Sequence, residues 1–359
     1  MSPYSLTVAG GVQGQVLGLG EALRGLGVDA RVLGPCDGPP PDAMVTPLGN
    51  SVATAANGSM AAIAPDLPAA LRTIRALRDE GFDLVHLHEP LAPGPTLTAL
   101  VFNDGPMVGT FHRAGVAGWY RAVRPLCAWG LGHLAVRAAV SEEARDSIAE
   151  VLPGTYEVLW NGIDTDRYST TEPWPTTGPT ILFVGRHEPR KGLAVLIEAM
   201  RYLPSGVRLW VAGEGPETSR LRHTTSRDER VEWLGPVSEW DKVRRLQGAD
   251  VLCAPSLGAE SFGVVLLEGL AAQTPVVATD LAGYRRVVRA DQDARLVPPG
   301  DPHALAGALR TAIEHGPEVS AMVVSGHDRA AGFSLDRLAE RYLELYEKVI
   351  ANQAASIRL

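Results

Sequence analysis

At 359 residues the chain is long enough for two domains, and its content of 45% hydrophobic and 21% charged residues excludes a disordered chain. The formal net charge of −8 excludes a general nucleic-acid binder, which needs an excess of lysine and arginine. Three widely spaced cysteines, Cys36, Cys127 and Cys253, argue against a disulfide framework or a zinc site, and the lack of a leader pattern or of roughly 18 apolar residues in a row predicts a cytoplasmic location.

Short apolar runs alternate with helix-like segments, which is typical of β–α units around parallel sheets. A glycine-rich turn at 9–12 follows Met1 so closely that the central strand expected before it is almost absent. Either the start was assigned too late or the sheet has a gap at its centre; the first is favoured, because unpaired neighbouring strands are costly. In the first half we predict strands over 28–33, 84–87, 107–111, 133–138 and 156–159.

Residues 170–179 are rich in proline and threonine and are typical of a linker. Beyond them, apolar residues at helical spacing from Ser334 to Ile350 predict one amphipathic closing helix. The sequence therefore predicts two doubly wound α/β domains, 1–169 and 170–333, and a closing helix within 334–359. The strands expected in the second domain are 181–185, 207–213, 231–235, 250–255, 275–279 and 295–298.

The turn at 185–192, GRHEPRKG, follows a predicted strand and opens a predicted helix. Arg186 and Lys191 would lie at the carboxyl end of that strand, where doubly wound sheets bind ligands, and the helix N-terminus adds positive potential. This arrangement favours a diphosphate as occupant; the alternative is a solvated charged turn. Because the two cations would neutralise a departing diphosphate, and no Asp-x-Asp cluster follows a strand, no metal is expected.

A second segment places two carboxylates, Glu260 and Glu268, after the predicted strand that ends at Pro255. Glu260, in a loop, would accept hydrogen bonds from sugar hydroxyls, and Glu268, two helical turns further along, would reach a ribose. The alternative is a helix with ordinary surface carboxylates. Gly258, Gly263 and the apolar run that follows favour a helix packed against a ligand.

These segments, together with GGVQ at 10–13, HEP at 88–90, GTFH at 109–112 and NGID at 161–164, give the chain a family resemblance. It resembles the family-4 retaining glycosyltransferases of GT-B fold, in which two Rossmann-like domains face a cleft. Within that family it is similar to the actinobacterial phosphatidylinositol α-mannosyltransferases, which use GDP-mannose. The resemblance covers nearly the whole chain in order, and it implies that residues 1–169 bind the acceptor and 170–333 the nucleotide sugar.

The resemblance also implies roles for single residues. Gly11 would approach the donor diphosphate, His112 would position and polarise the transferred sugar, and Glu260 and Glu268 would hold sugar and ribose. A carboxylate at Glu239 suits the adjacent donors of guanine and favours GDP over UDP, although a surface glutamate is the commoner state. The implied catalytic residues are His112, Arg186, Lys191 and Glu260, and the implied donor-binding residues are Gly11, Arg186, Lys191, Val237, Glu239, Lys242, Glu260, Ser261, Phe262, Gly263, Val264, Val265 and Glu268.

The acceptor side departs from the family pattern, because the segment Asn57-Gly58-Ser59-Met60-Ala61-Ala62 carries alanine at the place where the mannosyltransferases have an arginine. Arg113 would then supply a displaced phosphate contact. On the predicted helix at 71–78, three arginines on one side and apolar residues on another would bind an anionic leaflet; the alternative is a solvated face. The implied acceptor-binding residues are Tyr4, Gln13, Asn57, His112 and Arg113.

We therefore expect a retaining hexosyltransferase that moves mannose from GDP-mannose to phosphatidylinositol or a related lipid, without a cofactor, at the inner face of the plasma membrane. Two alternatives remain open. One is a UDP-sugar-dependent family-4 transferase with a soluble acceptor. The other is a non-catalytic protein that binds nucleotide sugar or a membrane surface.

Overall fold

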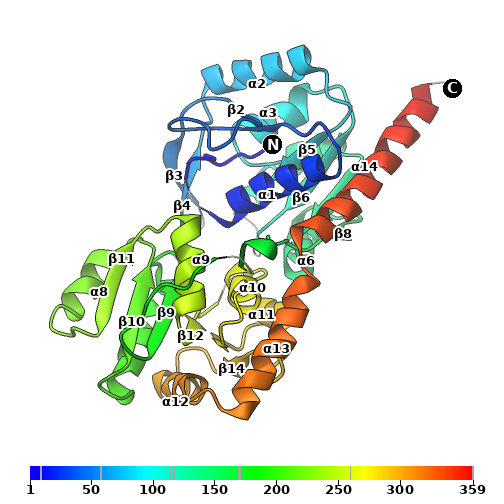
Figure 1. Ribbon diagram of the computed structural model, residues 1–359. Coiled ribbons are helices and arrows are strands. Elements are labelled where there is room, and N and C mark those ends of the chain that lie inside the picture. The colour runs from blue at the N-terminus through cyan, green and yellow to red at the C-terminus, as the bar shows by residue number, and fades with distance from the viewer. Residues whose placement is uncertain are drawn as a thin grey trace. The chain divides into compact units, whose positions relative to one another are not determined.

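The computed structural model describes residues 1–8, 10–56, 59–113, 115, 118–168, 171–258 and 260–357 (Figure 1). The chain divides into two compact units. The first comprises Met1–Gly162 and Leu335–Leu359, and the second comprises Ile163–Ser334. Residues 163–168, which the sequence analysis placed in the first domain, therefore belong to the second unit, and the closing helix belongs to the first.

The second unit contains a six-stranded sheet in the order β11-β10-β9-β12-β13-β14, in which every neighbouring pair is parallel. The order reverses between β9 and β12, so the crevice at their carboxyl ends is the switch point where such sheets bind ligands. The strands are β9 Thr180–Val184, β10 Arg208–Ala212, β11 Val231–Gly235, β12 Val251–Ala254, β13 Val276–Thr279 and β14 Arg295–Val297.

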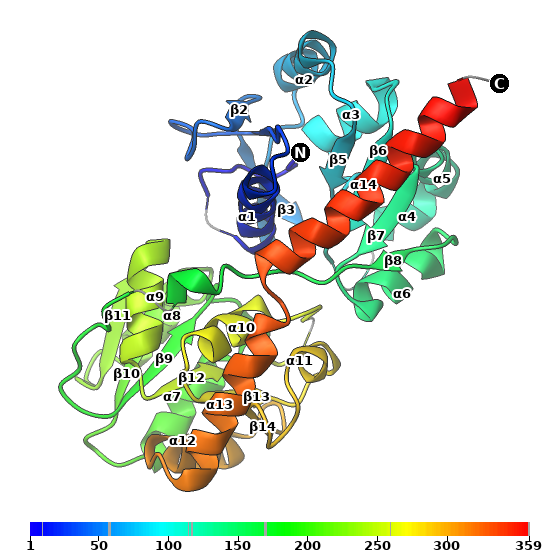
Figure 2. The same ribbon diagram turned by 45° about the vertical axis from the view of Figure 1, so that its right-hand side comes forward.

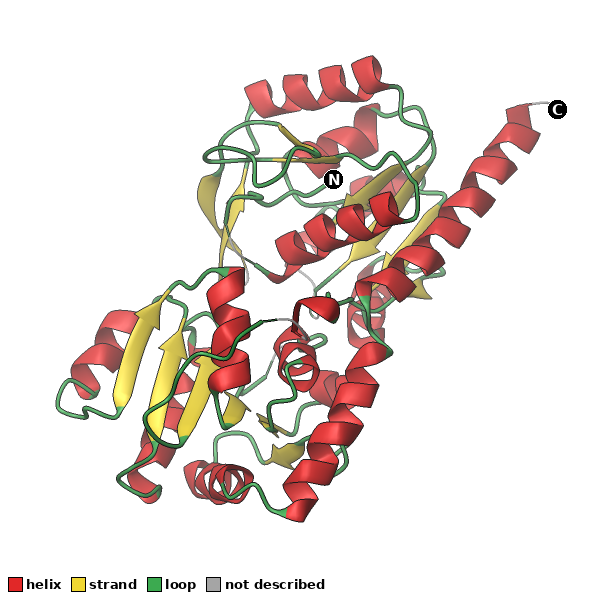
Figure 3. Ribbon diagram, viewed as in Figure 1, coloured by secondary structure: helices red, strands yellow, loops and turns green. Residues whose placement is uncertain are grey.

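Helices cover both faces of this sheet (Figure 3). Because side chains alternate along a strand, Ile181 and Phe183 of β9 join one core cluster with the helices α7 and α12. On the other face, α10 packs against α9 and α13. The helices are α7 Leu193–Ala199, α8 Thr218–Thr224, α9 Glu239–Gly248, α10 Val264–Ala271, α11 Ala282–Val287, α12 Pro302–Ile313 and α13 Pro317–Ala331, with 3₁₀ turns η1 Asp166–Tyr168, η2 Pro189–Lys191 and η3 Met200–Tyr202.

The first unit contains a four-stranded parallel sheet in the order β5-β6-β7-β8, a parallel pair β1-β2 and an antiparallel hairpin β3-β4. The predicted strand at 28–33 is wrong over most of its length, since β1 begins only at Val32, and β2, β3 and β4 were not predicted. The strands are β1 Val32–Gly34, β2 Val45–Pro47, β3 Val52–Ala56, β4 Ser59–Ile63, β5 Val85–His88, β6 Met107–Phe111, β7 Val136–Ala139 and β8 Glu157–Val158.

Met1 and Ser2 lie between β1 and β5 and hydrogen-bond to both strands. The Ser2 amide donates to Leu33 O at 2.8 Å on one side. On the other side the Met1 amine donates to His86 O at 2.6 Å, and the His88 amide donates to Met1 O at 3.1 Å. These two residues thus occupy the place of a central strand between the pair β1-β2 and the larger sheet.

The C-terminal helix α14, Leu335–Ile357, packs within the first unit. Figure 2 shows it running beside α1, and a methyl group at Gly18 of α1 would lie 2.5 Å from the Leu335 side chain. Leu338, Tyr342 and Leu345 of α14 share a core cluster with the sheet. The other helices of the unit are α1 Gly11–Gly25, α2 Leu67–Glu80, α3 Pro95–Phe102, α4 Gly118–Ala122, α5 Arg124–Leu131 and α6 Glu142–Val151.

Among the helices formed by the described residues, none has the length and apolar character that crossing a bilayer requires.

Candidate functional site

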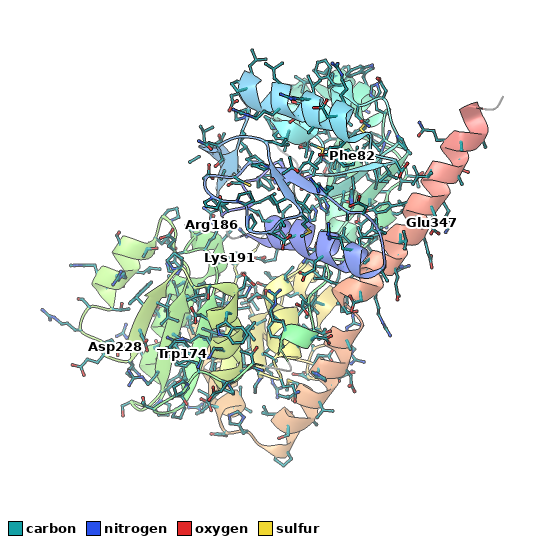
Figure 4. The ribbon with its side chains drawn as sticks, turned by 45° about the horizontal axis from the view of Figure 1, so that its top comes forward. Phe82, Trp174, Arg186, Lys191, Asp228 and Glu347 are labelled. Atoms are coloured by element: carbon teal, nitrogen blue, oxygen red, sulfur yellow. The ribbon has the colours of Figure 1, made fainter. Side chains whose placement is uncertain are left out.

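The strongest concentration of predicted site residues lies at the switch point of the second unit. One loop, 185–192, leaves the carboxyl end of β9, and the other, 255–263, leaves that of β12. Figure 4 shows Arg186 and Lys191 close together, far from Trp174 and Asp228, which precede the amino ends of β9 and β11. The structure therefore brings together the two segments that the sequence analysis considered separately.

Glycine allows these two loops to touch. Gly192, which ends the 3₁₀ turn η2, has φ of +70°, and a side chain there would clash with the carbonyl oxygen of Pro255. The Leu257 amide donates to Arg190 O at 2.7 Å across the same contact. The helix predicted to open at this turn begins only at Leu193, because the left-handed glycine separates η2 from α7.

Three cations and two carboxylates are interleaved on these loops. Glu188, whose side chain is 1% exposed, contacts Arg186 Nε at 3.1 Å and Arg190 Nε at 2.9 Å. Glu260 Oε1 lies 2.7 Å from Lys191 Nζ and 3.2 Å from Arg190 Nη1. Three positive groups against two negative ones leave an excess of positive charge, which suits an anionic ligand.

The residues after Glu260 lead into α10. Ser261 is half-buried and Phe262 is buried, while Gly263 caps the helix with φ of +92°. Val264 and Val265 form the half-buried first turn of α10, so their amides lie at a helix N-terminus where an anion is stabilised.

Glu268, further along α10, belongs to a second charged group. Lys242 Nζ lies 2.8 Å from Glu268 Oε1 and 2.8 Å from Glu239 Oε2. Burial alone would lower the pKa of Lys242, but the two carboxylates outweigh it and the pKa is raised. Glu239 is also 4.0 Å from Arg167 Nη1, and Val237 lies half-buried in the loop before α9. Glu239 is thus held by cations.

His112 lies in the first unit, directly after β6, in a buried polar cluster. Its Nε2 is 2.8 Å from His88 Nδ1, and its amide donates to Glu89 Oε1 at 2.7 Å. Burial lowers the pKa of His112 to about 4, although a hydrogen bond with Asn161 acts in the opposite direction. The imidazole is therefore neutral near pH 7.

The other residues predicted in this half lie on different elements. Tyr4 is half-buried and pairs with Ile63 of β4, and burial and then Glu89 raise its pKa. Arg113, half-buried after His112, acts on Glu89 and Tyr4 electrostatically. Gly11 and Gln13 lie in the first turn of α1. Asn57 falls outside the described residues.

The structure adds residues that sequence reasoning missed. Glu188 and Arg190 were visible within the EPRKG string, and His88 and Glu89 within HEP, but neither spacing revealed their partners. Glu89 has φ of +52°, a left-handed conformation that is unusual for a non-glycine residue and often found at functional sites. Ser256 also contacts Glu260, with its Oγ 3.0 Å from Oε1. Across the ranges that the structure describes, no three His, Cys, Asp or Glu side chains converge as metal ligands.

Comparisons with known proteins agree with this architecture. Residues 9–167 match the family described as Glycosyltransferase Family 4, and residues 178–315 match Glycosyl transferases group 1. The chain is 36% identical to the phosphatidyl-myo-inositol mannosyltransferase of Mycobacterium leprae, over 97% of this chain and 95% of that protein. The protein of the same name from Mycolicibacterium smegmatis is also 36% identical, over 97% and 92%.

Solved structures show the same fold. A glycosyltransferase from Rickettsia africae superimposes with a TM-score of 0.73 at 18% identity, covering 96% of both chains. Anabaena HepE in complex with UDP and glucose superimposes with a TM-score of 0.75 at 18% identity, covering 96% of this chain and 98% of that one.

Proposed function

The chain belongs to the family-4 glycosyltransferases of GT-B fold, and from this premise we propose that it transfers mannose from GDP-mannose to phosphatidylinositol or a related lipid. The relatives that it matches over nearly their full length are named phosphatidyl-myo-inositol mannosyltransferase, a name that supports the mannosyl group and the acceptor. We propose further that the second unit binds the donor and the first unit the acceptor, and that the anomeric configuration is retained.

The observation that carries the proposal is the pairing of Lys191 and Glu260 at the switch point, 2.7 Å apart and on loops from two different strands. When a sugar leaves a nucleoside diphosphate, negative charge grows on the phosphate and positive charge on the sugar. Lys191 and Arg186 would neutralise the first, and the carboxylate of Glu260 would hold hydroxyls of the second. Glu268 would reach the ribose, and Gly11, at the start of α1, would approach the diphosphate.

In the first unit, we propose that neutral His112 positions and polarises the transferred sugar. Tyr4, Gln13, Asn57 and Arg113 would bind the acceptor. Because no carboxylate is assigned to the opposite face of the sugar, the acceptor would attack from the same side as the departing diphosphate, which would also take up its proton. This retaining course is the one that the family resemblance implies.

We propose peripheral membrane contact through α2. Arg72, Arg75 and Arg78 of this helix are all exposed, so none is committed to the core. Leu67 and Leu71 are 70% and 57% exposed, and Phe102 of the neighbouring α3 is 60% exposed. Exposed apolar side chains beside basic ones are typical of helices that lie on anionic membranes.

A donor screen tests the proposal. Purified protein is incubated with lipid extract and with GDP-mannose, UDP-glucose or ADP-glucose, and release of nucleoside diphosphate is measured. We expect turnover with GDP-mannose that depends on the lipid, and turnover on the order of a hundredfold lower from Glu260→Gln. Turnover with UDP-glucose and a water-soluble acceptor would replace the proposal with the UDP-sugar-dependent alternative. If the protein binds a nucleotide sugar but turns over none of the three donors, the non-catalytic alternative is correct.

A further inference from the structure

The carboxylate of Glu260 is held by only one of its two oxygens. Oε1 is the atom closest to Lys191 at 2.7 Å and to Arg190 at 3.2 Å, and it accepts a hydrogen bond from Ser256 Oγ at 3.0 Å. No hydrogen bond reaches Oε2 from any residue that the structure describes. The side chain is thus fixed at one oxygen and retains the acceptor capacity of the other.

The contact from Ser256 is the end of a buried hydroxyl chain. Tyr284 Oη lies 2.9 Å from Ser256 Oγ. Ser256 Oγ donates its single hydroxyl proton to Glu260, so in the hydrogen bond between Tyr284 and Ser256 the Tyr284 hydroxyl is the donor. The order Tyr284 to Ser256 to Glu260 gives every hydroxyl in the chain the same direction, and bonds aligned in this way polarise one another.

The packing around the hydroxyl chain of Tyr284 and Ser256 holds both side chains in place. Tyr284 is 1% exposed on α11, and burial followed by the charge of Glu260 raises its pKa, so that its hydroxyl keeps its proton. The backbone of Ser256 is itself fixed, since Thr279 Oγ1 donates to Ser256 O at 2.5 Å. Thr279 ends β13, and Tyr284 lies on α11 beyond it, so a third strand-to-helix connection supports the loop that carries Glu260.

Two glycines let α11 approach that loop. A methyl group at Gly263 would lie 2.6 Å from the ring of Tyr284, and one at Gly283 would clash with the carbonyl oxygen of Glu260. Because neither position tolerates a side chain without a shift, the distance between Tyr284 and Ser256 is set by backbone packing. Nothing else in the mechanism proposed above requires this contact.

We propose that Tyr284 and Ser256 are positioning residues that orient Glu260, so that Oε2 is directed at a hydroxyl of the donor sugar. This inference rests on the proposed function, in which Glu260 holds the sugar. It adds that the strength of that contact depends on a tyrosine that does not touch the substrate. The sugar hydroxyl would donate a hydrogen bond to Oε2. That bond would become stronger in the transition state and so lower the free-energy barrier.

The test is a functional-group cycle with Tyr284→Phe and Ser256→Ala. Each variant is assayed with GDP-mannose and with its 2-, 3-, 4- and 6-deoxy analogues. With GDP-mannose we expect kcat/KM to fall about tenfold, as for loss of a hydrogen bond to a charged group. With the analogue that lacks the hydroxyl bound by Oε2, the kcat/KM of wild type divided by that of the variant should fall to about one. If the ratio of kcat/KM between wild type and variant is the same for all five donors, the proposal is overturned. A purely structural defect would lower kcat/KM equally, whichever hydroxyl the donor sugar lacks.

Tyr156→Phe is the matched control. It also removes one buried tyrosine hydroxyl, which donates to Leu152 O at 2.7 Å in the first unit. We expect it to show a ratio of one with every donor, and Ser256→Thr, which restores a hydroxyl, to recover part of the loss caused by Ser256→Ala.

Failure of the proposed function gives a different result. Wild type would then not turn over GDP-mannose, or Glu260→Gln would keep the wild-type rate. In that case equilibrium binding is measured in place of turnover. The ligand is whichever of UDP-glucose and ADP-glucose raises the melting temperature of wild type more, and the deoxy analogues of that ligand complete the series. A variant penalty that disappears with one analogue supports the positioning role, and a uniform penalty overturns it.

Discussion

Lys191 and Lys242 are two of only three lysines in the chain, and each lies against the carboxylates of the candidate site. Lysine is a compact point charge that suits phosphate, whereas Arg230 and Arg289 form planar, bidentate pairs with aspartates outside the site. The third lysine, Lys348 on α14, lies in the first unit and provides a control for the removal of a positive charge.

At this scale the first prediction concerns the pair at the switch point. Lys191→Ala and Glu260→Ala should each lower turnover by on the order of a hundredfold, because each removes charge that stabilises the transition state. Steady-state release of nucleoside diphosphate measures this, with circular dichroism to verify the fold. Lys348→Ala should retain the wild-type rate. If either site variant also retains it, the site assignment is wrong.

A second prediction concerns Lys242, which neutralises Glu268 and Glu239. Lys242→Met removes the cation shared by the two carboxylates and leaves only the 4.0 Å contact of Glu239 with Arg167, so we expect the melting temperature to fall by several degrees and donor affinity to weaken. The double variant Lys242→Met/Glu268→Gln should recover part of the stability but not the affinity, since Glu268 is proposed to bind ribose. A double variant no more stable than Lys242→Met alone would contradict the charge argument.

At the scale of the element, strand β5 carries two histidines on one face. His86 Nδ1 lies 2.7 Å from Tyr346 Oη of α14, and its Nε2 lies 2.7 Å from Thr110 Oγ1 of β6. The rings of His86 and His88 are 4.2 Å apart, and His88 leads to His112. Burial, and then the charge of neighbouring groups, lowers the pKa of His86 and His88 well below the usual value.

These buried, neutral histidines predict that the folded protein loses stability at acidic pH. A histidine whose folded pKa is depressed stays neutral in the native state while the unfolded chain takes up a proton, so stability is complete above about pH 6.5 and is lost as the pH falls. For His112 the loss should run from about pH 6.5 to about pH 4 and amount to about 3 kcal/mol. Urea denaturation at a series of pH values measures it.

The His112→Leu variant isolates this contribution. Its stability should depend less on pH over that range than that of wild type. His223→Gln, on the exposed face of α8, should follow the wild-type curve. Parallel curves for wild type and His112→Leu would show that His112 is not neutral in the folded protein.

Helix α2 gives a further prediction at this scale. Replacing Arg72, Arg75 and Arg78 by glutamine should weaken binding to vesicles containing phosphatidylserine by about tenfold or more, because each cation near an anionic surface contributes up to about 1 kcal/mol. Vesicle co-sedimentation at low and physiological salt measures it. The control for charge alone is a triple substitution of the exposed arginines Arg201, Arg222 and Arg227 in the second unit, and the salt dependence of each protein is compared as well. Equal vesicle binding by wild type and the α2 variant would remove the membrane role of α2.

The elements of the second unit were predictable because its strands are short apolar runs, of which β9, β10, β12 and β13 are almost wholly buried, and because a glycine or a proline follows most of them. In the first unit the hairpin β3-β4 was missed, since Val52–Ala56 and Ser59–Ile63 consist mainly of alanine and other small residues that carry no strand pattern. The separate 3₁₀ turn at 189–191 was missed because it depends on the conformation of Gly192.

The candidate site was predictable only in part, for a related reason. Arg186, Lys191 and Glu260 lie in loops that follow strand ends, and parallel strands bring their carboxyl ends to one edge. Tyr284 could not be predicted, because its contact with Ser256 depends on how closely two glycines allow α11 to approach. The pairing of Glu239 with Lys242 was likewise not predicted, since the resemblance implied only that each binds the donor.

At the scale of the whole molecule, the first unit is completed by the far end of the chain. Leu338, Tyr342 and Leu345 of α14 share a core cluster with Leu19 of α1 and Val108 of β6. The sequence predicted the helix and its apolar face, but the face alone could not indicate which unit it covers. That assignment requires the contacts.

Ending the chain after Ser334 should therefore destabilise the unit that lies first in the sequence. We expect calorimetry to show loss of the cooperative transition of the first unit, while the second keeps a transition that nucleotide shifts upward. A chain ended after Asn352, which removes only the last turns of α14, should keep both transitions. Retention of both transitions by the shorter chain would show that α14 is dispensable for the first unit.

The second unit starts and finishes at one point in space. The Ile163 amide donates to Phe333 O at 2.9 Å, and Ile163 bridges to Ser334 in parallel register. A segment whose ends adjoin can be spliced out of one chain and into another without stretching either. Recombination between homologous genes can thus exchange residues 163–334 as a cassette; with the donor in the second unit and the acceptor in the first, as we propose, nucleotide preference would evolve separately from the choice of acceptor.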